Sequence, residues 1–248
     1  MKTIDLNADL GEGYDDATVM PYISSANVAC GVHAGDAETM RRTVELCLQH
    51  GVAVGAHPSL PDREGFGRRE MNIPPDQVYA QTLHQIGTLA AIAKAGGAEL
   101  HHVKPHGALY NMAARERALA DAIARAVHDF DPNLVLVGLA GSASIEAARA
   151  SGLDCAQEGF CDRRYRADGS LSPRSQAGAV IEDIGRAIEQ ALSIATRGEV
   201  VADDGTRLRI AADTLCVHGD RLDAGEFARG LREALEQAGL RVAAPGHT

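Results

Sequence analysis

The sequence predicts an α/β protein of parallel β/α units, most simply a TIM-like (β/α) barrel, in a single domain over residues 1–248. Short apolar runs of strand length alternate with segments of helical periodicity along the chain. A length of 248 residues is typical of one α/β barrel. With 45% hydrophobic and 23% charged residues, the chain has enough apolar side chains for a full core. It contains no linker, low-complexity tract or internal repeat that would divide it.

Seven apolar runs have the length of buried strands, at residues 3–8, 27–30, 52–55, 99–103, 134–138, 153–156 and 212–217. Apolar side chains at helical spacing predict helices between them, at residues 36–50, 76–95, 119–130, 181–192 and 227–235, with shorter ones at 15–24 and 142–150. Parallel strands joined by right-handed helical crossovers either close into a barrel or form an open sheet wound in both directions.

One segment departs from this alternation. Residues 198–208 (GEVVADDGTRL) contain Asp204-Gly205, a dipeptide typical of a tight turn between two strands. We therefore expect a small β-hairpin inserted before the last barrel strand.

Composition and charge exclude several classes of protein. The net charge of −10, without any cluster of Lys and Arg, disfavours binding to nucleic acid. No apolar run approaches the roughly 18 residues that a membrane span needs. The first residues (MKTID) carry a carboxylate where a signal peptide needs an apolar run. Five cysteines without a CxxC pair suit reduced thiols, so we expect a cytoplasmic protein without a disulfide framework.

Polar side chains gather directly after, or at the ends of, the predicted strands. In chain order they are Asn7 with Asp9 and Glu12, Asn27 with His33, His57, Lys104 with His106, Tyr110 and Asn111, Glu158 with Arg163, and His218 with Asp220. The carboxyl ends of all strands in a parallel barrel lie on one face. These groups are therefore expected to converge, although they are far apart in sequence, and this convergence predicts an enzyme.

Each residue alone also has an ordinary structural interpretation. Asp36 could simply cap the helix that follows it. A lone His33 or His57 could be a hydrogen-bonded loop histidine, although each directly follows a strand and is flanked by small residues or proline. Cys30 and Cys216 fit small buried apolar positions better than nucleophiles.

Lys104 is the most informative single position. The chain has only three lysines among 24 basic residues, and Lys104 ends an apolar strand and precedes Pro105, which favours an extended backbone. Its ordinary role would be an ion pair with Glu158 or Asp9. Its functional roles would be to bind an anion, to polarise a carbonyl or to form a Schiff base. The phosphate-binding loop, the dinucleotide glycine motif, the serine-hydrolase elbow and HExxH are all absent.

Six ordered motifs together resemble the LamB/YcsF family from end to end. They are IDLNADLGEGY (4–14), NVACGVHAGD (27–36), GAHPSLPDREGFGRREM (55–71), HVKPHGALYN (102–111), EGFCDRRYRADGSLSPRS (158–175) and DTLCVHGD (213–220). The resemblance implies a seven-stranded β/α barrel distantly related to polysaccharide deacetylases. It also implies ATP-dependent opening of 5-oxoproline to L-glutamate, with ATP, alone or with Mg²⁺, as cofactor and with partner subunits B and C.

A five-membered lactam is a stable amide, and ATP can activate it by phosphorylating its oxygen. Without a phosphate-binding loop, either this chain binds ATP in an unconventional way or a partner performs the phosphorylation. As a hypothesis, Asp9 or Glu158 is the general base for the attacking water. His57 or His106 then protonates the leaving ring nitrogen.

The remaining expected roles are electrostatic. Lys104 and Arg163 would stabilise the oxyanion or the phosphorylated oxygen, because fixed positive charge in a closed site favours developing negative charge. Arg174 would pair with the substrate carboxylate through two hydrogen bonds. The further substrate-binding positions expected are Asn7, Glu12, Asn27, His33, Tyr110 and Asn111.

Two other functions remain open from the sequence. A metal-dependent amidase or deacetylase could hold a divalent ion with Asp9, His33 and His57, each after a different strand. Alternatively, the chain could be a binding protein that only delivers substrate to its partners. Such a protein would keep its ligand affinity and show no turnover defect when acid–base groups are removed.

Overall fold

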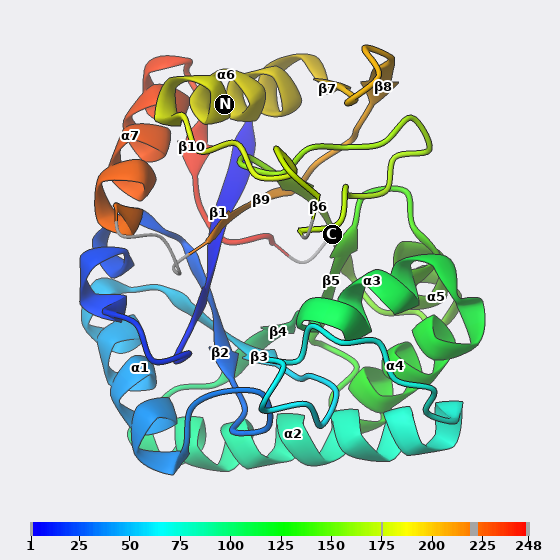
Figure 1. Cartoon of the computed structure of the whole chain (residues 1–248). Helices are drawn as coiled ribbons and strands as arrows, with labels where there is room; N and C mark the ends of the chain where they lie inside the picture. The colour runs from blue at the N-terminus through cyan, green and yellow to red at the C-terminus, as the bar shows by residue number, and fades with distance from the viewer. Residues whose placement is uncertain (1, 175, 219–222, 247–248) are drawn as a thin grey trace.

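The chain forms a closed barrel of parallel strands (Figure 1). A computed structural model describes residues 2–174, 176–218 and 223–246. The barrel strands are β1 (Thr3–Leu10), β2 (Ser25–Ala29), β3 (Ala53–His57), β4 (Leu100–Val103), β5 (Val135–Leu139), β6 (Cys155–Phe160) and β9 (Thr214–His218). Neighbours in this order pair in parallel, and β1 pairs with both β2 and β9, which closes the ring. The predicted seven-stranded (β/α) barrel is confirmed.

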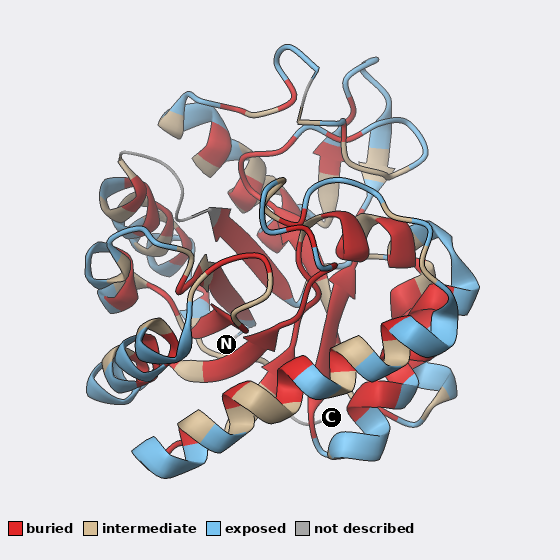
Figure 2. Ribbon diagram, turned by 60° about the horizontal axis from the view of Figure 1, so that its bottom comes forward, coloured by how far each residue is buried: buried red, intermediate tan, exposed pale blue. Residues whose placement is uncertain are grey.

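Helices surround the barrel and bury their apolar faces against it (Figure 2). They are α1 (Ala37–His50), α2 (Pro75–Gly96), α3 (Gly107–Arg115), α4 (Arg117–Phe130), α5 (Ala143–Ala150), α6 (Ile184–Leu192) and α7 (Ala224–Gln237). Helix α1 begins at the residue after Asp36, whose side chain accepts a hydrogen bond from the Thr39 amide at 2.8 Å. The capping interpretation of Asp36 is therefore confirmed.

The predicted helix at residues 15–24 is wrong. This segment instead forms two short 3-10 turns, Asp16–Thr18 and Met20–Tyr22. Pro21 has no amide hydrogen to continue a helical ladder. The Asp15 side chain also accepts a hydrogen bond from the amide two residues on, which favours a turn over a helix.

Two other boundaries differ from expectation. Helix α6 begins at Ile184 rather than at residue 181, because the amide of Ile181 donates to the carbonyl of Asp162 at 2.7 Å and Asp183 caps the helix. Helix α3 was not predicted, and its residues follow the polar segment after β4 directly.

Outside the barrel, β7 (Glu199–Val201) and β8 (Arg207–Arg209) form an antiparallel pair, with Gly205 in the turn between them. A two-residue strand, β10 (Arg241–Val242), pairs with the start of β1. No helix in the described part of the chain has the length and apolar character needed to cross a membrane.

The interior of the barrel is unusually polar. Buried polar residues occupy its strands, among them Asp5, Asn7, Asn27, His102, Glu158 and Thr214. Gly55 makes room for one of them, since a Cβ atom at this position would lie 2.1 Å from Nε2 of His102. Buried polar groups require hydrogen-bond partners, and here those partners form a network that extends to the carboxyl ends of the strands.

Candidate active site

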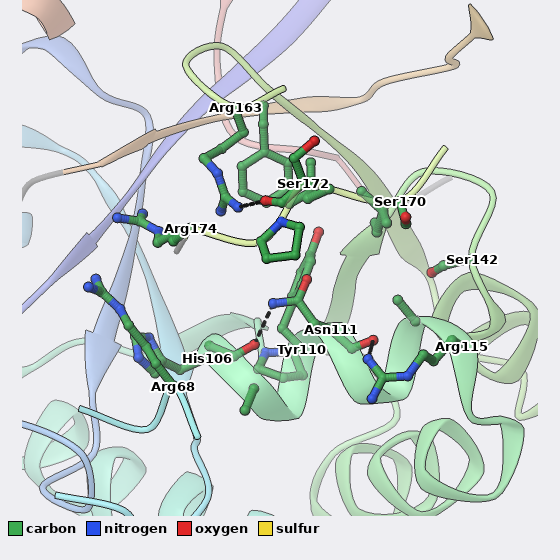
Figure 3. Close-up of a pocket in the computed structure, with 18 of the residues that line it drawn as sticks. Arg68, His106, Tyr110, Asn111, Arg115, Ser142, Arg163, Ser170, Ser172 and Arg174 are labelled. Carbon is green, nitrogen blue, oxygen red and sulfur yellow. Dashed lines mark hydrogen bonds between the residues drawn. The ribbon is translucent and has the colours of Figure 1, made fainter. Parts of the chain in front are cut away.

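A cavity of about 870 Å³ opens at the carboxyl ends of the strands (Figure 3). Its floor includes Asp9 from β1, His57 from β3 and Lys104 directly after β4. The carboxyl ends of parallel strands meet at this face, so residues from distant parts of the chain line one space. The expected site residues in the cavity lining are Asp9, Glu12, His57, Lys104, His106, Tyr110, Asn111, Arg163 and Arg174.

Lys104 is buried between two carboxylates. Its Nζ atom lies 2.8 Å from Oε1 of Glu158 and 3.0 Å from Oδ1 of Asp9. Burial opposes the charge on Lys104, but the attraction of Asp9, together with that of Glu158, outweighs it and holds the pKa of Lys104 well above its usual value. Lys104 is therefore a fixed positive charge, which favours anion or carbonyl binding over Schiff-base chemistry.

Four of the expected site residues are absent from the cavity lining: His33, and three that lie beneath the floor. Asn7 donates to Oε1 of Glu158 at 2.9 Å, and Asn27 donates to Oδ1 of Asp9 at 2.9 Å. Oδ1 of Asn7 also accepts from Lys104 Nζ at 3.1 Å. The two amides and Glu158 thus orient Asp9 and Lys104, and the lining of the cavity includes none of the three.

The network continues away from the cavity to Asp5. The hydroxyl of Thr214 donates to Asp5 at 2.6 Å, and Ser24 and Ser25 donate to its other oxygen at 2.7 and 2.8 Å. Burial raises the pKa of Asp5 to about 6, although these three hydrogen bonds oppose the rise. This buried acid of the barrel therefore titrates close to the physiological range rather than near pH 4.

Three histidines gather around Glu12 on the other side of Asp9. Oε1 of Glu12 lies 2.9 Å from Nε2 of His33, 3.3 Å from Nδ1 of His106 and 3.8 Å from Nε2 of His57. The rings of His33 and His106 stack with centroids 3.8 Å apart. Because their four ligand atoms lie within 4.8 Å of one another, these residues could hold a metal ion.

The protonation of the three rings differs. Burial lowers the pKa of His33 and holds the pKa of His106 well below its usual value. Burial also opposes charge on His57, but Asp9 and Glu12 outweigh it and raise the pKa of His57. The Nε2 atom of His57 lies 3.4 Å from Oδ2 of Asp9, so this histidine joins the cluster to the lysine network.

The loop after β3 fixes the position of His106. The amide of His106 donates to the carbonyl of Pro58 at 2.8 Å, and its Nε2 lies 2.8 Å from the carbonyl of Phe66. The next residue, Gly107, has a positive φ of 55°, and a Cβ there would lie 2.6 Å from the carbonyl oxygen of Gly67. Only glycine fits this close approach without strain.

Arginines form much of the cavity wall. Arg163 is only 6% exposed, and its guanidinium donates to the carbonyl of Ser172 at 2.6 Å. Within the described residues its Nε–H has no hydrogen-bond partner. Burial, and then the charge of Arg174, lowers the pKa of Arg163 to about 10. A buried guanidinium with an unused donor favours an anionic ligand.

Further arginines in this wall were missed from sequence. Arg68, Arg166 and Arg115 also line the cavity, and Figure 3 shows Arg68 and Arg174 on the same side of it as Arg163. Arg68 and Arg166 lie inside two of the family-like motifs, 55–71 and 158–175. Their position after strand ends was the available signal, but arginine is too frequent in this chain for any single one to stand out.

The remaining expected positions are also placed. Tyr110 is buried, and burial, followed by the charge of Glu158, holds its pKa well above the usual value. The Asn111 side chain donates to the carbonyl of Gly107 at 2.9 Å. Burial raises the pKa of the Cys30 thiol to about 12, which disfavours a nucleophilic thiolate. Gly219 and Asp220, in the last expected polar segment, lie outside the described residues.

Comparison with known proteins agrees with this fold. The fold is similar to that of a T48 deacetylase solved with substrate, which superposes with a TM-score of 0.52 at 13% identity, over 98% of this chain and 87% of that one. A lactam utilization protein from Thermus thermophilus is far more similar, with a TM-score of 0.91 and 51% identity over 98% of this chain and 100% of that chain.

The model of the LamB/YcsF family matches residues 4–248. The 5-oxoprolinase A subunit of Bordetella pertussis is 56% identical over 97% of this chain and 98% of its own length. The corresponding 5-oxoprolinase protein of Geobacillus kaustophilus is 53% identical over 99% of this chain and 98% of its own length. The chain therefore belongs to the LamB/YcsF family.

Proposed function

We propose that this chain opens the ring of 5-oxoproline to give L-glutamate, as one subunit of an ATP-dependent hydrolase of cyclic amides. The activity is the one named for its relatives, and a lactam is also named for the Thermus thermophilus protein. The observation that supports it most directly is the 3.0 Å pair of Asp9 and Lys104 on the floor of a cavity with an arginine wall. This pairing puts a base beside a fixed positive charge, as hydrolysis of an activated amide requires.

The chemistry follows from the stability of the lactam. The amide oxygen attacks the γ-phosphorus of ATP, and ADP leaves. Water then adds to the activated ring carbon and loses a proton to a base. The C–N bond of the ring breaks, and the nitrogen takes up a proton. A second water releases phosphate from the resulting acyl phosphate and leaves glutamate.

Asp9 is the better candidate for the base, because it lines the cavity and Glu158 does not. Glu158 instead keeps Lys104 charged from below. Lys104 and Arg163 stabilise negative charge on the reacting oxygen. His57 or His106 returns a proton to the ring nitrogen when the pair carries one.

Residues of the cavity wall bind the substrate. Arg174 pairs with the carboxylate of 5-oxoproline, and Tyr110 and Asn111 contact the ring. The excess of arginine supports binding of a phosphate as well, either that of ATP or that of a phosphorylated lactam. The nitrogen-rich cluster at Glu12 does not suit the Mg²⁺ of the nucleotide, since Mg²⁺ prefers oxygen ligands.

We further propose that the chain works in the cytoplasm with partner subunits B and C. Its relatives are named as one of the subunits of 5-oxoprolinase, which supports a complex of several different chains. The five cysteines are free thiols, as a reducing compartment would keep them.

The test is 5-oxoproline-dependent glutamate formation with ATP, measured for the chain alone and with candidate B and C subunits from the same source. Asp9→Asn, Lys104→Ala and His57→Ala are each expected to abolish most of the turnover of the assembled complex. The matched control is Glu64→Gln, since this side chain is 93% exposed. Near-normal turnover in all three variants would show that the site is wrongly assigned. No glutamate from any combination of subunits would overturn the function itself.

A further inference from the structure

The inner nitrogens of two histidines face each other at the edge of the cavity floor. Nδ1 of His57 lies 2.7 Å from the carbonyl of Lys104, and Nε2 of His106 lies 2.8 Å from the carbonyl of Phe66. A carbonyl only accepts hydrogen bonds, so both of these outer nitrogens carry hydrogen. In neutral rings the inner nitrogens, Nε2 of His57 and Nδ1 of His106, are then two lone pairs only 2.9 Å apart. Such an arrangement is repulsive unless a cation lies between them.

Glu12 and His33 complete the surroundings of this point. Oε1 of Glu12 is 3.3 Å from the inner nitrogen of His106 and 3.8 Å from that of His57, and 2.9 Å from Nε2 of His33. A tetrahedral ion with bonds of about 2.0 Å has ligand atoms separated by roughly 3.3 Å. Four of the six separations between these ligand atoms, from 2.9 to 3.8 Å, bracket this value, and all six lie within 4.8 Å.

The charges nearby also favour a cation. Asp9, Glu12 and Glu158 are three carboxylates in or directly under the floor, and Lys104 is the cation that pairs with two of them. In the described part of the chain, Glu12 forms its ion-pair contacts with histidines. A proton shared by two histidines adds one positive charge, whereas a divalent ion adds two. Together with Lys104, a divalent ion would therefore balance the three carboxylates.

We propose that Glu12, His33, His57 and His106 bind a divalent transition-metal ion of the zinc class. Three imidazole nitrogens and one carboxylate oxygen suit zinc and its neighbours rather than Mg²⁺ or Ca²⁺. The carbonyls of Lys104 and Phe66 orient two of the rings in the way that outer partners orient metal-binding histidines. The set differs from the Asp9, His33 and His57 expected from sequence. Glu12 contacts all three rings, whereas Asp9 lies 3.4 Å from His57 and pairs with Lys104.

The site goes beyond the proposed ring opening, since metal binding can be measured whether or not the chain turns over 5-oxoproline. It also constrains that reaction. If an ion were bound there, His57 and His106 would share no proton, and Asp9 would return the proton to the ring nitrogen. The ion would supply Lewis acidity next to the base.

The test is the metal content of untagged protein purified without chelator, followed by titration of chelator-treated protein. We expect about one zinc ion per chain, saturable rebinding of Zn²⁺ by calorimetry, and a visible absorption spectrum of the Co²⁺ form with nitrogen ligands. Bound Zn²⁺ is also expected to raise the midpoint of thermal unfolding. Folded wild-type protein that neither contains nor rebinds Zn²⁺ or Co²⁺ would overturn the proposal and indicate a shared proton instead.

Variants identify the ligands. Glu12→Gln and His106→Ala are expected to weaken Zn²⁺ binding by more than the roughly 10- to 100-fold lost with an outer partner. The matched control is His84→Ala, an exposed histidine of α2, which leaves binding unchanged. For Asp9→Asn, we expect the Zn²⁺ affinity to fall by no more than the roughly 10- to 100-fold that loss of an outer partner causes. If Asp9→Asn abolishes binding while Glu12→Gln retains it, the proposed ligand set is wrong.

Discussion

The Nζ atom of Lys104 lies 2.8 Å from Oε1 of Glu158, with both side chains almost completely removed from water. Lys104 follows β4 and Glu158 lies in β6, so the pair joins two strands that are not neighbours in the sheet. Neither charge can be hydrated, and each depends on the other and on Asp9 for its stability. The site and the stability of the barrel are therefore coupled at this pair.

Replacing Lys104 should destabilise the fold. Lys104→Met leaves the buried Glu158 and the half-buried Asp9 without their cation, and we expect the free energy of unfolding to fall by about 3–5 kcal/mol. The double variant Lys104→Met/Glu158→Gln should lose less than the single one. Urea denaturation measures both, with Arg117→Met, which breaks an exposed pair with Asp121, as a nearly neutral control. A double variant less stable than Lys104→Met would contradict this coupling.

Asp5 should make stability depend on pH. Its pKa is raised from 3.8 to about 6 in the folded chain, so between these values the folded state binds more protons than the unfolded one. The free energy of unfolding should thus fall as the pH rises from about 4 to about 6, by roughly 3 kcal/mol from this group. Asp5→Asn should remove that slope, whereas Glu64→Gln should retain it. Unfolding curves at about pH 4, 5, 6 and 7 measure the slope, and an unchanged slope in Asp5→Asn would refute this assignment.

Arg163 should contribute to ligand affinity more than to stability. Arg163→Met removes the buried guanidinium from the wall, and we expect the affinity for an anionic ligand to fall on the order of 10- to 100-fold. Arg163→Lys should recover only part of it, because an ammonium cannot reproduce the planar donor pair. Calorimetric titration with 5-oxoproline and with ATP, separately, shows which anion the arginine contacts. The control is Arg207→Met on the exposed hairpin, and equal losses in both variants would exclude a specific role.

Gly107 should be intolerant of any side chain. Gly107→Ala combines a positive φ with a Cβ placed 2.6 Å from the Gly67 carbonyl oxygen, and we expect a loss of about 1–3 kcal/mol together with displacement of His106. Gly205→Ala also has a positive φ, of 89°, but no atom within 4 Å of the new Cβ. Thermal unfolding of the two variants separates the close contact from backbone strain, and equal losses would show that the contact has no effect.

Much of the barrel could be predicted because the signals are local. Apolar runs and helical spacing are properties of neighbouring residues, and they located all seven barrel strands and most helices. The parallel topology then placed the polar strand ends on one face, which brought together Asp9, His57, Lys104 and His106. Proline at position 21 also has a local effect, but the apolar residues around it predicted a helix that the structure does not contain.

The contacts within the site depended on tertiary structure. Pairing of Asp9 with Asn27 in register sets which side chains of β1 and β2 share a face, and the sequence does not specify that register. Other contacts of the site arise between segments that are distant in sequence. The carbonyls of Phe66 and Gly67 approach His106 and Gly107. Glu12, rather than Asp9, forms the cluster with the three histidines. The sequence by itself determined which residues stand at the strand ends. Only the folded barrel decided which of their atoms meet, because distances of about 3 Å depend on strand register and loop packing rather than on residue order.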